Sequence, residues 1–286
     1  MHQVSSRLLP AAVFGSLLVL GAPFAHAAAT APYLGVAPQG NAAQGAGDVA
    51  VCASCHGQHG NSMAPNFPNL AGQNYNYLLK QLEDFRSGAR QNATMSAMIQ
   101  TVPPAPGDAN LQNIARYFSS QTLNLKANAN AATPKVPFDL AKEGYLIYQG
   151  GVPSHKVPAC AACHMPSGLG NAPMAIPTLA GQHATYVENE LNLFATGQRH
   201  NSAGHVMEVI ARRLRPEQRK AVAAYAEVLD PKLIEGIGPL DYATYVKDRA
   251  SQPLPGVLAS ALAMPVKAVS KKVENKAAGN KKAGNK

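Results

Sequence analysis

The sequence predicts an all-α protein built from two tandem helical domains. Three observations carry this prediction: apolar residues recur at three- and four-residue spacing, strand-type alternation is absent, and the second half repeats the first. The segments Leu70–Gln73 and Leu179–Gln182 are identical and lie 109 residues apart. The same offset relates six further pairs: Pro68 and Pro177, Tyr77 and Tyr186, Leu82 and Leu191, Phe85 and Phe194, Gly88 and Gly197, and Arg90 and Arg199.

Each repeat predicts three helices. The middle helix is amphipathic and stops at a glycine suited to a C-terminal cap, Gly88 or Gly197, and Pro216 suits the first turn of the last helix. The expected helices span 44–53, 75–85 and 109–119 in the first repeat, and 139–149, 185–194 and 216–229 in the second.

The domain boundaries follow from these helices and from composition. We expect the first domain at 45–122 and the second at 138–232, joined by a linker at 123–137 that is rich in Asn and Ala. Residues 28–44 form an N-terminal extension, and residues 233–286 form a C-terminal extension that ends in a Lys-rich tail.

All four cysteines belong to two copies of one motif, C-x-x-C-H. Such a motif is typical of covalent c-type haem attachment, in which both thiols bond to the haem vinyl groups and the histidine ligates iron. Zinc sites and disulfides, the alternatives for such pairs, leave the histidines unexplained, and no βαβ pattern supports a redox dithiol. The sequence therefore predicts two covalently bound haem c groups, attached at Cys52, Cys55 and His56, and at Cys160, Cys163 and His164.

Each iron needs a ligand on both faces. His56 and His164 are the expected proximal ligands, and each ring's other nitrogen should donate to a backbone carbonyl. Pro68 and Pro177, in the segments that follow the two motifs, are the candidate carbonyl acceptors, although they could instead only shape a turn.

Methionine and histidine are the candidates for the distal faces. In the second domain Met207 lies on an expected loop before the last helix, and His205 on the same loop could compete with it. In the first domain Met95 and Met98 both occupy the corresponding loop, and the offset of 109 pairs Met98 with Met207. A thioether ligand would raise the reduction potential.

The chain resembles the di-haem cytochrome c4 family, which consists of two tandem class I cytochrome c domains. The resemblance covers about residues 45–230 and rests on both C-x-x-C-H motifs and on segments 68–73, 77–85 and 117–121. It implies two cytochrome c-like domains, each wrapped round one covalent haem, with His/Met coordination through Met95 in the first and Met207 in the second. Glu190, where the family has Gln, is one departure.

The N-terminus predicts export. Residues 1–27 are typical of a cleavable signal peptide, with Arg7, an apolar run at 8–20 and an A-x-A site at 25–27. Covalent haem attachment of this kind is completed outside the cytoplasm, so we expect the periplasm if the source is a bacterium. The alternative is an uncleaved N-terminal anchor.

The net charge of +9 is concentrated at the C-terminus. The last twenty residues hold seven Lys against Glu274 alone, so nucleic-acid binding is not indicated. We expect this tail to be disordered and to aid solubility. The alternative is an arm that docks on a membrane surface or an acidic partner.

Two fully ligated irons leave no open position for a substrate. The sequence therefore favours a non-enzymatic carrier that moves single electrons between a donor and an acceptor, such as a periplasmic copper protein, a cytochrome or a membrane oxidase. One alternative is a di-haem oxidoreductase of the peroxidase or thiosulfate dehydrogenase type, in which His205 beside Met207 would permit a displaceable ligand. Another is a tethered haem subunit of a respiratory complex.

Overall fold

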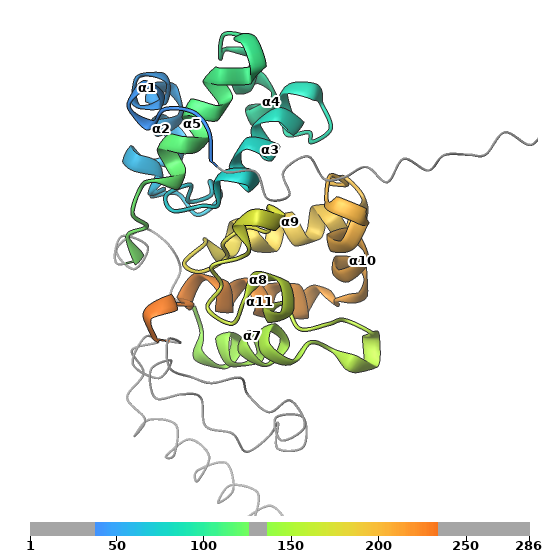
Figure 1. The fold of residues 1–286 in the computed structure, drawn as a ribbon. Helices are drawn as coiled ribbons and strands as arrows, with labels where there is room; N and C mark the ends of the chain where they lie inside the picture. Colours follow the sequence, from blue (N-terminus) through green and yellow to red (C-terminus); the bar gives the residue numbers. More distant parts are fainter. Residues whose placement is uncertain (1–37, 126–135, 234–286) are drawn as a thin grey trace, which may run out of the picture. The chain divides into compact units, whose positions relative to one another are not determined.

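The computed structural model describes residues 38–125 and 136–233, and it confirms the prediction of tandem all-α domains (Figure 1). The first half contains α1 (Ala42–Asp48), α2 (Ala50–His56), α3 (Tyr75–Ser87), α4 (Ala93–Gln100) and α5 (Ala109–Ser119). The second half contains α7 (Phe138–Gly150), α8 (Ala161–His164), α9 (Ala184–Thr196), α10 (Val206–Arg213) and α11 (Pro216–Val228).

Short 3-10 turns connect several of these helices, at Gln58–Gly60, Pro106–Asp108, Pro153–His155, Ala172–Met174, Ala203–His205 and Pro231–Leu233. Within the described ranges the only β-type pairing is two isolated bridges, Val152 with Val157 and Asn171 with Ile176. None of the described helices has both the length and the apolar character that a membrane-spanning segment requires. The predicted signal peptide, most of the linker and the Lys-rich tail lie outside the described residues.

Two sequence expectations about secondary structure were wrong. The helix expected at 44–53 is two helices, because the backbone of Val49 leaves the helical region (φ −90°, ψ 0°) while its side chain is buried in the core. The segments that carry the candidate methionines are helical rather than loops. Met95 lies in the first turn of α4, which Asn92 caps, and Met207 is the second residue of α10.

The first and last helices of each half cross at a glycine. A Cβ atom added to Gly45 would lie 2.2 Å from the carbonyl oxygen of Asn113, and one added to Gly144 would lie 2.0 Å from that of Ala221. No other residue allows this separation. The equivalent contacts bring α1 against α5 and α7 against α11, and each pair closes its own apolar core.

The structural register of the repeat changes along the chain. The offset is 109 residues at Arg90 and Arg199, but buried positions in and just after the next helices match at an offset of 112: Ile99 with Ala211, and Val102 with Leu214. Three extra residues in the second half, between Arg199 and α10, account for the change. At the offset of 112 the partner of Met207 is Met95.

Candidate functional site

The two cysteines of each motif lie one helical turn apart. Cys52 and Cys55 are on α2, which ends at His56, while Cys160 is the N-cap of α8. None of the four cysteines forms a disulfide. Burial raises the pKa of the Cys52 thiol, and it raises that of Cys160 to about 12. Across the described residues no group of three or more His, Cys, Asp or Glu side chains is arranged to hold a metal ion.

The two motif histidines have the same environment. Nδ1 of His56 donates to the Pro68 carbonyl oxygen at 3.0 Å, and Nδ1 of His164 donates to that of Pro177 at the same distance. Burial lowers the pKa of both rings, against the opposing effect of these hydrogen bonds. Each imidazole is therefore oriented by a backbone carbonyl and held neutral, as an iron ligand requires.

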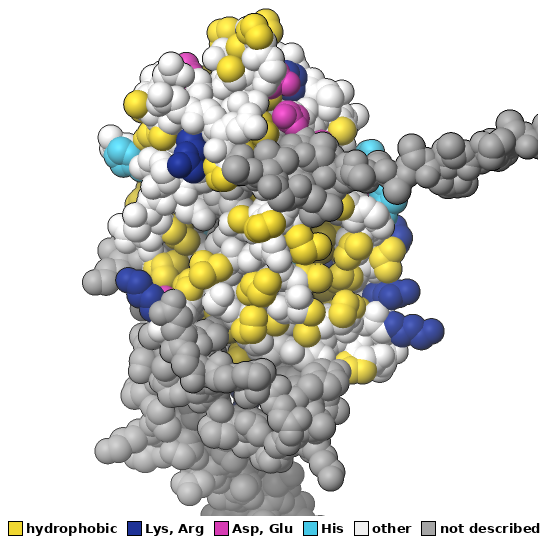
Figure 2. All heavy atoms as spheres, viewed as in Figure 1, with side chains coloured by type: hydrophobic (Ala, Val, Ile, Leu, Met, Phe, Trp, Pro, Cys, Tyr) yellow, Lys and Arg dark blue, Asp and Glu magenta, His cyan; other side chains and the backbone are white. Residues whose placement is uncertain are grey.

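The surroundings of the motifs fit a haem. Nε2 of His56 is buried and has no hydrogen-bond partner, which is the atom an iron would take. Large apolar side chains next to the motifs are exposed, and Figure 2 shows hydrophobic side chains gathered on the second half over the region of α8 and α9. Three of the exposed side chains are methionines: Met63, Met165 and Met174.

The candidate distal ligands and the motif cysteines pack against the same cores. Met95 and Cys52 both contact the apolar cluster of the first half, and Met207 and Cys160 both contact that of the second. Met98 is half-buried and lies outside the first cluster. Together with the offset of 112, this favours Met95 over Met98 as the counterpart of Met207.

A polar clasp that sequence reasoning missed holds the backbone at each methionine. Asn92 Oδ1 accepts from the backbone nitrogen of Met95 at 3.0 Å, and Ser202 Oγ accepts from that of Met207 at 3.1 Å. The Ser202 hydroxyl in turn donates to the carboxylate of Glu208, whose residue is 2% exposed. An Asn two residues before a Thr-Met pair is an N-cap signal that could have revealed α4.

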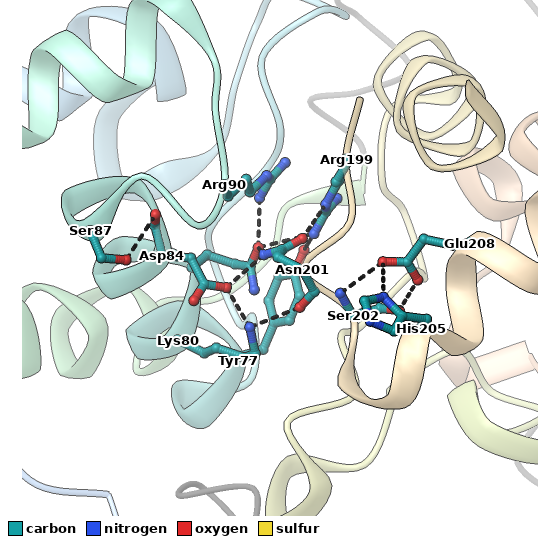
Figure 3. Close-up of polar contacts among 11 residues, drawn as sticks. Tyr77, Lys80, Asp84, Ser87, Arg90, Arg199, Asn201, Ser202, His205 and Glu208 are labelled. Atoms are coloured by element: carbon teal, nitrogen blue, oxygen red, sulfur yellow. Dashed lines mark hydrogen bonds and ion pairs between the residues drawn. The ribbon is translucent and has the colours of Figure 1, made fainter. Parts of the chain in front are cut away.

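His205, the competing candidate, lies against Glu208. Its Nδ1 is 3.5 Å from Glu208 Oε1, and its side chain is 70% exposed (Figure 3). The backbone of His205 has a left-handed φ of 56° and forms the N-cap position of α10. Its ring is therefore engaged on the outer side of the segment that carries Met207.

A buried ring of four side chains joins the two halves. Arg90 contacts Gln81 at 2.9 Å and Glu190 at 3.0 Å, and Arg199 contacts the same two residues at 3.0 Å and 2.7 Å. Each guanidinium also lies over an aromatic ring of its own half. The ring is thus closed by two cations, one carboxylate and one amide.

Comparison with known proteins gives consistent matches over both halves. A family model described as cytochrome c matches residues 42–122 and 141–229. The chain is 40% identical over 200 residues to cytochrome c4 of Azotobacter vinelandii. The aligned region covers 66% of this chain and 90% of that protein. The chain is 36% identical over 182 residues to a thiosulfate dehydrogenase electron acceptor of Stutzerimonas stutzeri, covering 61% of this chain and 76% of that protein.

A solved structure matches the same region. The crystal structure of reduced recombinant cytochrome c4 from Pseudomonas stutzeri superposes with a TM-score of 0.59 and 38% sequence identity, over 66% of this chain and 98% of that one.

Proposed function

Because this chain belongs to the di-haem cytochrome c4 family, we propose that it carries single electrons through the periplasm between two protein partners. Membership establishes that the chain holds two covalently attached haem c groups and acts in electron transfer. Each bound haem supplies reversible one-electron chemistry at its iron. We propose, beyond this, the compartment, the partners and the residues that ligate each iron.

For each haem we propose two cysteines as the attachment residues and one histidine and one methionine as the iron ligands. Cys52 and Cys55 hold the first haem and Cys160 and Cys163 the second, with His56 and His164 as proximal ligands. Met95 and Met207 are the distal ligands. This assignment is supported by the orphan Nε2 of His56, by the paired proline carbonyls and by the shared contact of each methionine with its motif's core.

Two observations favour an electron carrier over an enzyme: the proposed ligation of both irons and the similarity to a protein named as an electron acceptor. Two thioether-ligated irons have no vacant position for a substrate, and His205, which could have displaced Met207, lies against Glu208. The relative from Stutzerimonas stutzeri is named as an electron acceptor of a dehydrogenase. A dehydrogenase is therefore one candidate donor, beside periplasmic copper proteins and cytochromes, with a membrane oxidase as a candidate acceptor.

Ferric absorption spectroscopy of the purified holoprotein tests this function. The weak long-wavelength band that marks methionine–iron ligation should have the intensity expected for two haems. Met95→Ala and Met207→Ala should each remove half of it, and Met98→Leu should leave it intact. High-spin ferric haem in the unaltered protein at neutral pH would instead favour the oxidoreductase.

Location needs a separate measurement. Cell fractionation should recover the haem-containing protein in the periplasmic fraction, with the mature N-terminus near Ala28 as the A-x-A site predicts. Recovery with the membranes, with residues 1–27 retained, would favour the tethered subunit.

A further inference from the structure

Asn92 and Asn201 are equivalent positions in the repeat, but their side chains form different hydrogen bonds. At the offset of 109 they follow Arg90 and Arg199 by two residues. Asn92 caps its own helix, accepting from the backbone nitrogens of Thr94 at 3.1 Å and Met95 at 3.0 Å. In the second half Ser202 accepts from Met207 instead. The three extra residues of this segment therefore release Asn201 from capping.

Asn201 bonds across to helix α3 of the first half (Figure 3). Its side-chain nitrogen donates to Asp84 Oδ2 at 2.6 Å and to Gln81 Oε1 at 3.0 Å, and its backbone carbonyl accepts from Lys80 Nζ at 2.9 Å. Lys80 and Asp84 also form an ion pair with each other, and their side chains are only 21% and 15% exposed. Two charged groups of one half thus hold both the side chain and the backbone of one residue in the other.

The contact is one residue away from the clasp on Met207. Ser202 follows Asn201, and its hydroxyl accepts from the Met207 backbone nitrogen while donating to Glu208. The stretch between, Ala203–His205, is exposed, and Gly204 and His205 have left-handed φ values of 60° and 56°. Such a segment has little packing of its own, so its position depends on the anchored residues at its start.

Among the described residues, Asn92 has no hydrogen bond to the second half that matches those of Asn201 to the first. In α9 the positions equivalent to Lys80 and Asp84 are Asn189 and Leu193, which offer neither the ammonium nor the carboxylate that binds Asn201. The oxygen of the Asn92 side chain is already used by its own helix. The two halves therefore differ on both sides of this contact: in the residues of the middle helix and in the hydrogen bonds of the asparagine.

We propose that Lys80 and Asp84 are positioning residues for the distal ligand of the other domain's haem, acting on Met207 through Asn201 and Ser202. This rests on the proposed ligation of the second iron by Met207. The second iron–methionine bond then depends on the contact of Asn201 with the other half, whereas the backbone of Met95 is capped by Asn92 of its own half. A partner that shifts the halves against each other would loosen one haem's ligand selectively.

Displacement of the methionine by imidazole tests the proposal in the holoprotein. In a Met95→Ala background, the remaining long-wavelength band reports the second haem alone. Adding Asp84→Leu, which places the second half's own residue at this position, should lower the imidazole concentration that removes half of the band by about tenfold, the effect of losing one charge-assisted hydrogen bond. Asn201→Ala should have the same effect from the other side of the contact.

Two controls separate positioning from general destabilisation. Asp84→Asn keeps an oxygen that accepts from Asn201, so it should restore most of the imidazole resistance. In a Met207→Ala background, where the band reports the first haem, Asp84→Leu should leave imidazole binding unchanged.

The outcomes distinguish this proposal from the ligand assignment on which it rests. A band that survives Met207→Ala at full intensity would overturn the assignment and the positioning role together. A Met207-dependent band whose imidazole sensitivity is unchanged by both Asp84→Leu and Asn201→Ala would overturn the positioning role alone. Equal loosening at both haems would also overturn it, because the contact would then act only through overall stability.

Discussion

Gln73 and Thr178 form a closed pair of hydrogen bonds between the two halves. The Gln73 amide donates to the Thr178 carbonyl oxygen at 2.9 Å and accepts from the Thr178 backbone nitrogen at 2.8 Å. Gln182 forms the same pair, with the same distances, with the backbone of Asn69. Since these residues exchange under the offset of 109, the repeated glutamine joins the halves reciprocally, as in an interface between twofold-related domains.

Truncating either glutamine should weaken this interface. Gln73→Ala removes both bonds and leaves a buried backbone donor and acceptor unpaired, which should cost about 2 kcal/mol. Denaturant unfolding followed by haem absorbance and by helix content would measure the loss. Gln91→Ala, at an exposed position, is the control and should change stability by no more than about 0.5 kcal/mol. Equal effects of the two variants would contradict a structural role for the glutamine pair.

Two glycines of helix α1 should respond oppositely to alanine. The Cβ of Gly45→Ala would lie 2.2 Å from the Asn113 carbonyl, so α1 and α5 must separate, at a cost of about 3 kcal/mol or more. A Cβ added to Gly47 would have nothing within 4 Å, so Gly47→Ala should stabilise the helix by about 0.5–1 kcal/mol. Thermal unfolding of the two variants side by side measures both effects, and destabilisation by Gly47→Ala would contradict the assigned crossing point.

Local patterns predicted much of this molecule. The C-x-x-C-H motifs, the stop glycines Gly88 and Gly197, and the amphipathic middle helices are short-range signals, and the structure places α3 and α9 within a few residues of the expected bounds. Both stop glycines have the left-handed φ that a C-terminal cap requires, 83° and 77°.

Local patterns could not predict the change of repeat offset before Met207 or the contacts between the two halves. A single offset of 109 pairs Met98 with Met207, because the extra residues lie between Arg199 and α10, where no identity marks the shift. The start of α10 gives no cap signal either, since His205 makes no side-chain cap bond. Contacts such as Lys80 with Asn201 join residues 121 positions apart, and no local pattern encodes them.

Stability should fall as the pH rises from about 4.5 to about 7 because of Glu83. Burial, reinforced by the nearby carboxylates of Asp108 and Asp84, raises the pKa of Glu83 to about 7. The folded state therefore holds a proton that the unfolded chain has already released above about pH 4.5. The stabilising contribution is complete below that pH and is lost as the pH rises through about 7.

Urea unfolding at several pH values compares the parent with Glu83→Gln. The variant cannot ionise, so it should be the more stable of the two at pH 8, and its advantage should disappear at about pH 4. An advantage that is the same at both pH values would show that the glutamine acts through packing rather than through charge.

Glu190 is the sole carboxylate of the buried ring, so its replacement should affect both stability and redox behaviour. In Glu190→Gln the two guanidinium groups of Arg90 and Arg199 keep their hydrogen-bond geometry but lose their shared anion. Breaking a buried ion pair in this way should cost about 3 kcal/mol. Removal of a negative charge between the halves should also raise both reduction potentials, since a reduced haem carries less positive charge than an oxidised one.

Gln81→Glu is the matched variant, because Gln81 occupies the equivalent position in the first half and contacts the same two arginines. It gives each guanidinium its own carboxylate, so it should be tolerated in unfolding experiments and should lower both potentials. Redox titration of the two proteins would then give shifts of opposite sign. If Glu190→Gln changed neither stability nor potential, another anionic group would have to balance the two arginines, and the ring could not be the feature that ties the halves together electrostatically.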